Sequence, residues 1–222
     1  MDSKTIPLPQ HGNYQYGYQL AYRLAVEQLA RTENLEQQCH KSDARIKLID
    51  EKKVILIQYL GQSYQVCHPD VEVSLVDSQE LVPLKDKLLI LHYLNRAKGS
   101  PLSGKAITYK ELPEGINYIS NFTKRAIKPL LKSFGQQPER LPAAAAILFG
   151  ARKADYGDAA VTIDAFIRVP ITLVLWRGDE ELAPEGNILF DSTIPDYLST
   201  EDITVLCETI VWRLASFLKA KG

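Results

Sequence analysis

The 222-residue sequence predicts an α+β fold, in which an antiparallel meander and a second β-hairpin pack with about five helices. Two observations support this prediction. Short runs rich in β-branched residues follow one another between residues 45 and 75, and a strongly amphipathic segment closes the chain after Ser199. No repeat or long linker separates the elements. We therefore expect a single domain over residues 1–222, with the first helix packed on it.

The first predicted element is a helix over residues 13–32, because Tyr18, Tyr22, Ala25 and Leu29 recur at steps of three and four residues. Tyrosines on such a stripe can stack on a planar ligand, but they more often form a core face whose hydroxyls reach solvent or backbone. We prefer the core interpretation. The meander is expected to follow in four short strands: Arg45–Ile49, Val54–Leu60, Gln62–Val66 and Val71–Leu75.

Helical spacing returns in the middle of the chain. Leu84, Leu88 and Leu91 predict a helix over residues 81–97, and two further helices are expected at 118–134 and at 139–149, the last rich in alanine. Two apolar runs come next, at 159–167 and 171–176, and they predict a hairpin.

The end of the chain gives the clearest helix signal. Its apolar residues share one helical face: Ile203, Leu206, Cys207, Ile210, Leu214, Phe217 and Leu218. Ser199 followed by Asp202 resembles a capping box, and Glu201 suits the positive end of the helix dipole. Cys207 falls on the apolar face and is expected in the core.

Composition excludes some classes of function. Lysine and arginine number 26 against 27 aspartates and glutamates, so no global charge drives binding to nucleic acid or to an anionic membrane, although a local basic patch is not excluded. No stretch approaches the ~20 apolar residues of a membrane span, and the first residues lack the apolar core of a secretory signal. Three widely separated cysteines make no disulfide framework. We expect a cytoplasmic protein.

Two apparent motifs carry little weight. The segment Gly99–Lys105 has the glycine and lysine spacing of a phosphate loop, but Ala106 supplies no hydroxyl for magnesium and the segment follows a helix where a strand is needed. The dipeptides Cys39-His40 and Cys67-His68 contain the ligand types of a zinc or iron site. Because neighbouring strand residues point to opposite faces, one buried thiol and two solvent-facing imidazoles are the simpler interpretation.

Acidic residues beside a tryptophan form the best functional candidate. Trp176 ends the second apolar run and is followed by Asp179, Glu180 and Glu181, and we expect a ligand site there together with His92 and Tyr93. Asp158 and Asp164 share one strand face with Thr162 and are the candidates for a divalent metal, because hard cations prefer carboxylate oxygens. The alternative without a function is that these acidic residues belong to a solvated loop and to helix caps, and that the tryptophan belongs to the core.

Several of these segments together resemble one family. They are Gly104–Pro113 after Leu89–Leu94, Leu130 with Phe134-Gly135, Asp158–Ala160, Leu175–Glu181, Leu189–Asp191 and Glu201-Asp202. The chain resembles DUF3786, a family defined by a domain of unknown function, from about Cys39 onward. The resemblance implies an uncharacterised protein of anaerobic bacteria or archaea, with some relatives fused to a four-cysteine iron–sulfur module. It supplies no reaction and no catalytic residue.

The three cysteines lie far apart, so no iron–sulfur cluster is expected in this chain. Three functions remain open. The first is a noncatalytic module that binds a small ligand or cofactor of anaerobic redox or one-carbon metabolism. The second is a metal-dependent hydrolase or lyase that uses the clustered carboxylates. The third is a partner subunit of an iron–sulfur protein. Neither nucleic acid nor a membrane is expected as a partner.

Overall fold

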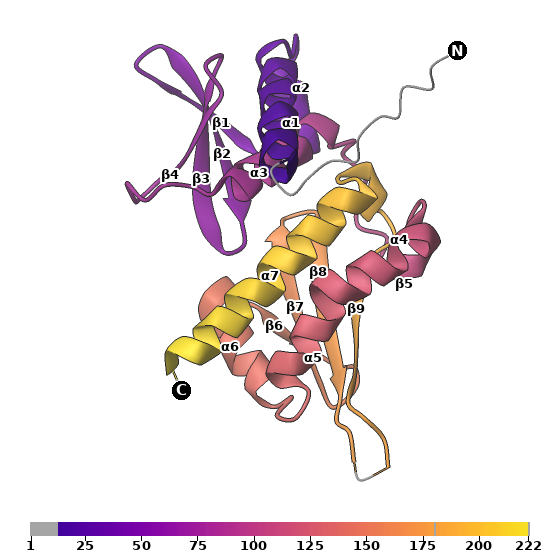
Figure 1. The fold of residues 1–222 in the computed structure, drawn as a ribbon. Helices are drawn as coiled ribbons and strands as arrows, with labels where there is room; N and C mark the ends of the chain where they lie inside the picture. The colour runs from indigo at the N-terminus through magenta and orange to yellow at the C-terminus, as the bar shows by residue number, and fades with distance from the viewer. Residues whose placement is uncertain (1–12, 180, 222) are drawn as a thin grey trace, which may run out of the picture.

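Two antiparallel sheets and seven α-helices make up the part of the chain that the computed structural model describes, residues 13–179 and 181–221 (Figure 1). The helices are α1 (Asn13–Ala30), α2 (Leu35–Lys41), α3 (Leu84–Arg96), α4 (Gly115–Phe122), α5 (Lys128–Phe134), α6 (Arg140–Phe149) and α7 (Thr200–Lys221). The strands are β1 (Arg45–Ile49), β2 (Lys52–Tyr59), β3 (Gln62–His68), β4 (Glu72–Leu75), β5 (Ala106–Thr108), β6 (Arg152–Ala154), β7 (Ala159–Phe166), β8 (Val169–Trp176) and β9 (Glu185–Asp191). The predicted α+β class is confirmed.

The first sheet is the predicted meander, with strand order β1-β2-β3-β4. Ile49 pairs with Lys52, so the first turn has two central residues, Asp50 and Glu51, and both have positive φ. Helices α1, α2 and α3 lie together with this sheet in the upper part of Figure 1. On α1, Ala25 and Leu29 are buried, and Tyr18 and Tyr22 pack against the core as the preferred interpretation required.

The second sheet has the order β5-β9-β8-β7-β6. The predicted hairpin, β7 and β8, forms its centre, and Thr162 pairs with Thr172 across it. The strands β5, β6 and β9 were not predicted, because two of them have only three residues and β9 shows no clear alternation. Helices α5 and α7 lie side by side in front of this sheet in Figure 1, and they also contact each other.

One prediction about the helices was wrong, and one helix was missed. Residues 118–134 do not form one α-helix: α4 begins earlier, at Gly115, and a π-helical turn over Thr123–Ile127 separates it from α5. Pro129 has no amide hydrogen to donate to the carbonyl of Arg125, which loosens the α-helical pattern just before α5. Helix α2, which contains Cys39-His40, was not predicted, because a helix of seven residues is too short for its periodicity to be recognised.

One continuous cluster of buried side chains connects the two sheets. The ring of Tyr93 on α3 stacks on Phe166 of β7 with 4.0 Å between centroids, and the amide of Leu60 donates to the carbonyl of Ala165. The apolar face of α7 completes the core. Cys207 is fully buried on that face, as predicted, and its burial raises the pKa of the thiol.

Candidate functional site

A cleft of about 460 Å³ opens where α7 begins. Its walls come from the end of α3, the start of α4 and the segment that leads into α7: Arg96, Pro113, Glu114, Tyr118, Pro195, Leu198, Ser199, Thr200 and Glu201. Prolines, a leucine and a tyrosine supply apolar wall, and the other side chains are polar. Ligand sites of proteins commonly have this mixture and a volume in the range of roughly 300–1,000 Å³.

A chain of three polar side chains stands behind one wall of the cleft. His92 Nδ1 lies 2.7 Å from Asp202 Oδ1, and the Ser199 hydroxyl donates to the other carboxylate oxygen of Asp202 at 2.5 Å. The amide of Asp202 in turn donates to the Ser199 hydroxyl, at 3.1 Å, so Ser199 and Asp202 form the predicted capping box of α7. His92 precedes Arg96 by one helical turn on α3, so the two side chains share a face of that helix.

The order of these three groups decides which chemistry is open to them. A nucleophilic serine needs an imidazole as its immediate partner, with the carboxylate behind that imidazole. Here Asp202 stands between Ser199 and His92, and the serine hydroxyl already donates to the carboxylate. The arrangement therefore orients the imidazole and caps the helix, but it does not activate Ser199.

The ionisation of Asp202 fixes the tautomer of His92. Burial opposes ionisation of this carboxyl, but hydrogen bonds from His92 and Ser199 outweigh it and hold the pKa below the ordinary value. An ionised carboxylate only accepts, so Nδ1 of His92 carries the hydrogen of their contact. In the neutral imidazole Nε2 then keeps its lone pair, and 28% of the His92 side chain is exposed.

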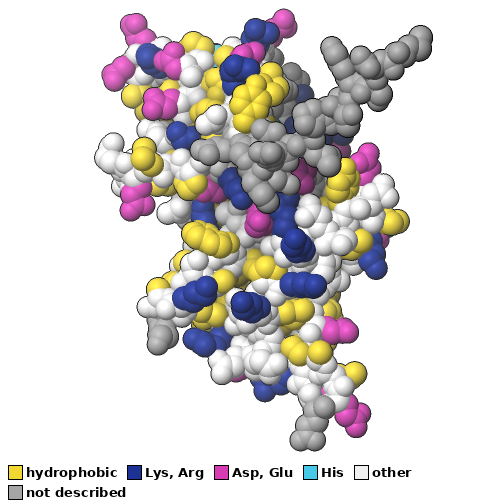
Figure 2. Space-filling model, viewed as in Figure 1, with side chains coloured by type: hydrophobic (Ala, Val, Ile, Leu, Met, Phe, Trp, Pro, Cys, Tyr) yellow, Lys and Arg dark blue, Asp and Glu magenta, His cyan; other side chains and the backbone are white. Residues whose placement is uncertain are grey.

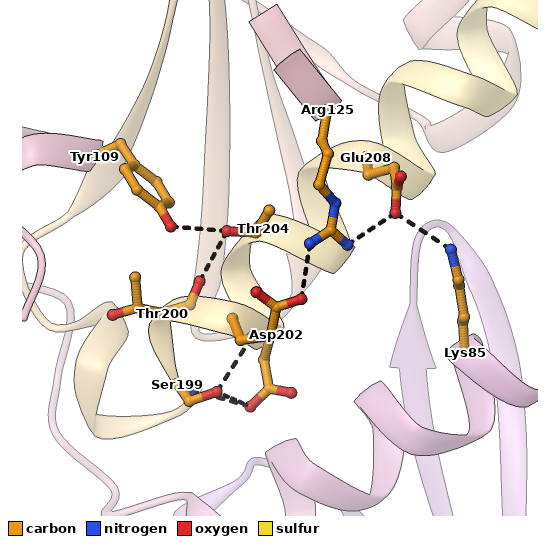
Figure 3. A network of polar contacts seen from close by, with 9 residues as sticks. Lys85, Tyr109, Arg125, Ser199, Thr200, Asp202, Thr204 and Glu208 are labelled. Atoms are coloured by element: carbon orange, nitrogen blue, oxygen red, sulfur yellow. Dashed lines mark hydrogen bonds and ion pairs between the residues drawn. The ribbon is translucent and has the colours of Figure 1, made fainter. Parts of the chain in front are cut away.

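A network of ion pairs fixes the first turns of α7 (Figure 3). Arg125, on the π-helical turn, binds Glu201 at 2.7 Å and Glu208 at 3.0 Å, and Lys85 of α3 also binds Glu208. Burial disfavours the charged form of Arg125, but the two glutamates outweigh it and raise its pKa. The Tyr109 hydroxyl pairs with that of Thr204. The wall of the cleft is thus held from three separate elements.

The structure separates the residues that the sequence suggested for one ligand site. His92 does not line the cleft but is joined to its wall through Asp202 and Ser199. Tyr93 on the same helix is fully buried, and its hydroxyl donates to the carbonyl of Ser42. Trp176, Asp179 and Glu181 lie on the hairpin between β8 and β9, which ends at the bottom of Figure 1, far from α3. Glu180 lies outside the described residues. Trp176 is 42% exposed at the end of its strand rather than in the core.

The two carboxylates suggested for a metal are also apart. Asp158 precedes β7 and accepts the amide of Arg177, whereas Asp164 lies near the far end of β7 and pairs with Arg152. Six residues of extended strand separate them by roughly 20 Å. Within residues 13–179 and 181–221, no group of three or more His, Cys, Asp or Glu side chains is arranged to hold a metal ion. The metal hypothesis stays a prediction without a cluster to support it.

The segment that imitates a phosphate loop already binds a carboxylate of the protein itself. The amides of Ser103 and Gly104 donate to Asp191 at 3.1 and 2.8 Å. Thr193 adds its amide and hydroxyl to the same carboxylate. The backbone groups that would bind phosphate therefore anchor the loop to β9, which agrees with the rejection of this motif.

The other cleft residues have only weak signals in the sequence. Ser199 was recognised only as a helix cap, and Arg96 and Tyr118 follow no motif. Arg96 and Tyr118 each lie on a helix whose opposite face is buried, so the sequence pattern could predict only that their side chains are exposed. Their convergence depends on the contact between α3, α4 and the start of α7, which no local pattern reveals.

The comparisons with known proteins place this fold in a family. The family model described as "Domain of unknown function (DUF3786)" matches residues 35–213. The chain belongs to the DUF3786 family. The matched DUF3786 region contains His92, Ser199 and Asp202, and it also contains both sheets. The search of curated proteins found no match, and the search of solved structures found none. Among the described residues of this DUF3786 protein, no helix has the length and apolar character needed to cross a membrane.

Proposed function

We propose that this DUF3786 protein binds a small organic molecule in the cleft at the start of α7, without a nucleophilic step of its own. The main support is the convergence of Arg96, Tyr118 and the first turn of α7 on one cleft, whose wall residue Ser199 is joined through Asp202 to the oriented His92 imidazole. Ligand sites commonly combine an apolar wall with a few fixed polar groups, and rigid neighbours limit the ordering cost of binding.

The side chains of the cleft suggest a ligand with a planar part and an anionic group. Tyr118 is 48% exposed and, with Pro195, offers surface for stacking. Arg96 is exposed and makes no ion pair within the described part of the chain, so its guanidinium is free to bind a carboxylate or phosphate. A cofactor of anaerobic redox or one-carbon metabolism is the class of ligand that the family resemblance suggests.

The proposal is tested by screening metabolites and cofactors for thermal stabilisation, followed by calorimetric titration of each hit. A ligand that binds only the native state raises its stability by mass action. We expect Arg96→Ala and Tyr118→Ala each to weaken binding about tenfold or more, because one lost charged or stacking contact contributes on the order of 1–2 kcal/mol. Arg23→Ala and Tyr16→Ala, on the exposed face of α1, are the matched controls and should bind normally. Ligands that bind all four variants equally would contradict the proposal.

A second candidate is a proton-transfer enzyme, and the contact between His92 and Asp202 favours it specifically. An imidazole that donates from Nδ1 to a carboxylate has its Nε2 lone pair available as a general base. The test is whether a ligand found in the screen is converted. For an enzyme, His92→Gln would lower kcat with little change in KM, whereas for a binding module no variant would show turnover.

A further inference from the structure

A stripe of lysines lies on the outer face of the helical segment that packs beside α7. Lys124, Lys128 and Lys132 are four residues apart and exposed, so they form one row of roughly 12 Å, which we call the lysine stripe. Residues 115–134 contain four basic residues and no acidic one. Figure 2 shows lysine and arginine side chains gathered over this part of the molecule, in the region of α5 and α7.

The opposite charge gathers on the hairpin between β8 and β9. The hairpin ends in an arm that projects from the body at the bottom of Figure 1, described at residues 177–179 and 181–185, and its last residue, Glu185, pairs with Trp176. We call this segment the acidic arm, because Asp179, Glu181 and Glu185 are all exposed on it. Figure 2 shows acidic and hydrophobic side chains at the same tip.

The described part of the arm has a defined shape. The Asp179 carboxylate accepts the amides of Glu181 and Leu182 at 2.9 and 2.7 Å, and the Asp179 amide donates to the Leu182 carbonyl. At the base of the arm, Pro184 lies so close to Gly135 that a Cβ on that glycine would approach it to 3.1 Å. The arm therefore presents Leu182, which is 69% exposed, at a fixed position.

Most charged side chains of the two surfaces have no ion-pair partner among the described residues, although Arg177 at the start of the arm pairs with Glu139. Among residues 13–179 and 181–221, no ion pair involves Lys124, Lys128 or Lys132, and none involves Glu181 or Glu185. The base of the arm packs against the end of α5, since Gly186 is in close contact with Leu131. The lysine stripe and the acidic arm are therefore neighbours in one chain.

We propose that two copies of this chain form a twofold dimer, in which the acidic arm of each copy lies on the lysine stripe of the other. A twofold dimer needs two complementary surfaces on each copy, and the stripe and the arm supply them. Each arm then meets the stripe of the other copy, so no charged surface is left to bind a third copy. The formal net charge of −1 leaves little repulsion between copies. A foreign acidic partner would use the stripe but leave the arm without a role.

Charge alone would not hold the dimer, because exposed ion pairs contribute little each. Trp176 and Leu182 provide the apolar anchors, with 42% and 69% of their surfaces exposed in the single chain. The lysines and glutamates fix the register of the two copies and exclude wrong pairings. We therefore expect the dimer to weaken as salt concentration rises.

The test is sedimentation velocity of the full chain over a range of concentrations, with two charge-reversed variants. Lys128→Glu/Lys132→Glu reverses the stripe, and Glu181→Lys/Glu185→Lys reverses the arm. Each variant alone should be monomeric, with the dimer dissociation constant raised at least tenfold. An equimolar mixture of the two should dimerise again, because both arm–stripe contacts in the mixed dimer regain opposite charges: the acidic arm of one variant meets the unchanged lysine stripe of the other, and the reversed arm meets the reversed stripe.

The controls separate association from folding. Arg45→Glu/Lys47→Glu reverses two exposed charges on β1 and should leave the dimer intact, and Leu182→Ser should weaken it with all charges kept. Circular dichroism of every variant should match that of the unmodified chain. The proposal would be overturned if the unmodified chain stayed monomeric at a concentration 100 times higher than 1 μM. It would also be overturned if the mixture of the two reversed variants formed no dimer.

Discussion

His92 on α3 and Asp202 on α7 meet with 2.7 Å between Nδ1 and Oδ1, and this contact joins the helix after the first sheet to the last helix of the chain. Only 9% of the Asp202 side chain is exposed. The same carboxylate closes the capping box of α7 with Ser199. Asp202 therefore links the start of α7, the wall of the cleft and α3 in one group.

Ser199 and Asp202 should show strong coupling in a double-mutant cycle. Ser199→Ala removes the cap and is expected to cost about 1 kcal/mol of unfolding free energy. Asp202→Asn removes the charge that orients His92 as well as half of the cap, and should cost about 2 kcal/mol. Because both changes break the same cap, the double variant should lose less than the sum. Urea unfolding at neutral pH gives the unfolding free energy of the unmodified chain and of the three variants. If the losses of the two single variants added up to the loss of the double variant, the two residues would act independently.

Asp191 should make stability depend on acid pH. Burial disfavours its charge, but hydrogen bonds from Thr193 and Ser103 outweigh it and lower the pKa from the ordinary 3.8 to about 2. A lowered pKa stabilises the native state above the unfolded value and loses that effect as pH falls through the folded value. Asp191→Asn should therefore cost about 2 kcal/mol at pH 6 and much less near pH 2.

Unfolding of both proteins in denaturant between pH 2 and pH 7 checks this prediction. Asp77→Asn, in an exposed bend after β4, is the control and should follow the unmodified chain at every pH. A cost for Asp191→Asn that is constant over the whole range would mean that lost packing, rather than lost charge, explains the effect.

The elements that the sequence predicted are those in which local pattern and burial coincide. On β7, Ile163 is buried and Asp164 exposed, as strict alternation requires. On α7, every predicted apolar position from Ile203 to Leu214 is buried. The strands β5 and β6 escaped prediction because each is a three-residue edge that depends on its neighbour for definition.

The site was harder to predict, since its members meet only through tertiary contacts. His92 was included on account of its residue type, and its partner Asp202 was recognised as a cap without the histidine. Trp176, Asp179 and Glu181 are close in sequence, yet they lie on a hairpin that projects at the bottom of Figure 1, and none of them lines the cleft at the start of α7. Proximity along the chain says little about which loops converge.

The buried ion pair of Asp86 and Arg213 should behave very differently from an exposed one. Asp86 is 2% exposed and accepts both from Arg213, at 2.7 Å, and from the Tyr59 hydroxyl, at 2.8 Å. Asp86→Ala leaves a partly buried guanidinium and a buried hydroxyl without their acceptor, so we expect a loss of about 3 kcal/mol. Asp70→Ala, which breaks an exposed pair with Lys52, should cost about 0–1 kcal/mol. Equal losses in urea unfolding would contradict this account.

The first turn of the meander offers a stabilising substitution. Asp50 and Glu51 have φ values of 48° and 64°, which is the left-handed region that glycine adopts without steric cost. Two-residue hairpin turns of this kind favour glycine at the second position. Glu51→Gly should therefore raise the unfolding free energy by about 0.5–1 kcal/mol, although the added freedom of the unfolded chain offsets part of the gain. Glu72→Gly, at the first residue of β4 and paired with Cys67, is the matched control and should destabilise, because there glycine only weakens a strand. If the backbone at Glu51 is strained, thermal and urea unfolding will show a gain of stability for Glu51→Gly and a loss for Glu72→Gly. A loss of stability in both variants would show that this turn gains nothing from glycine.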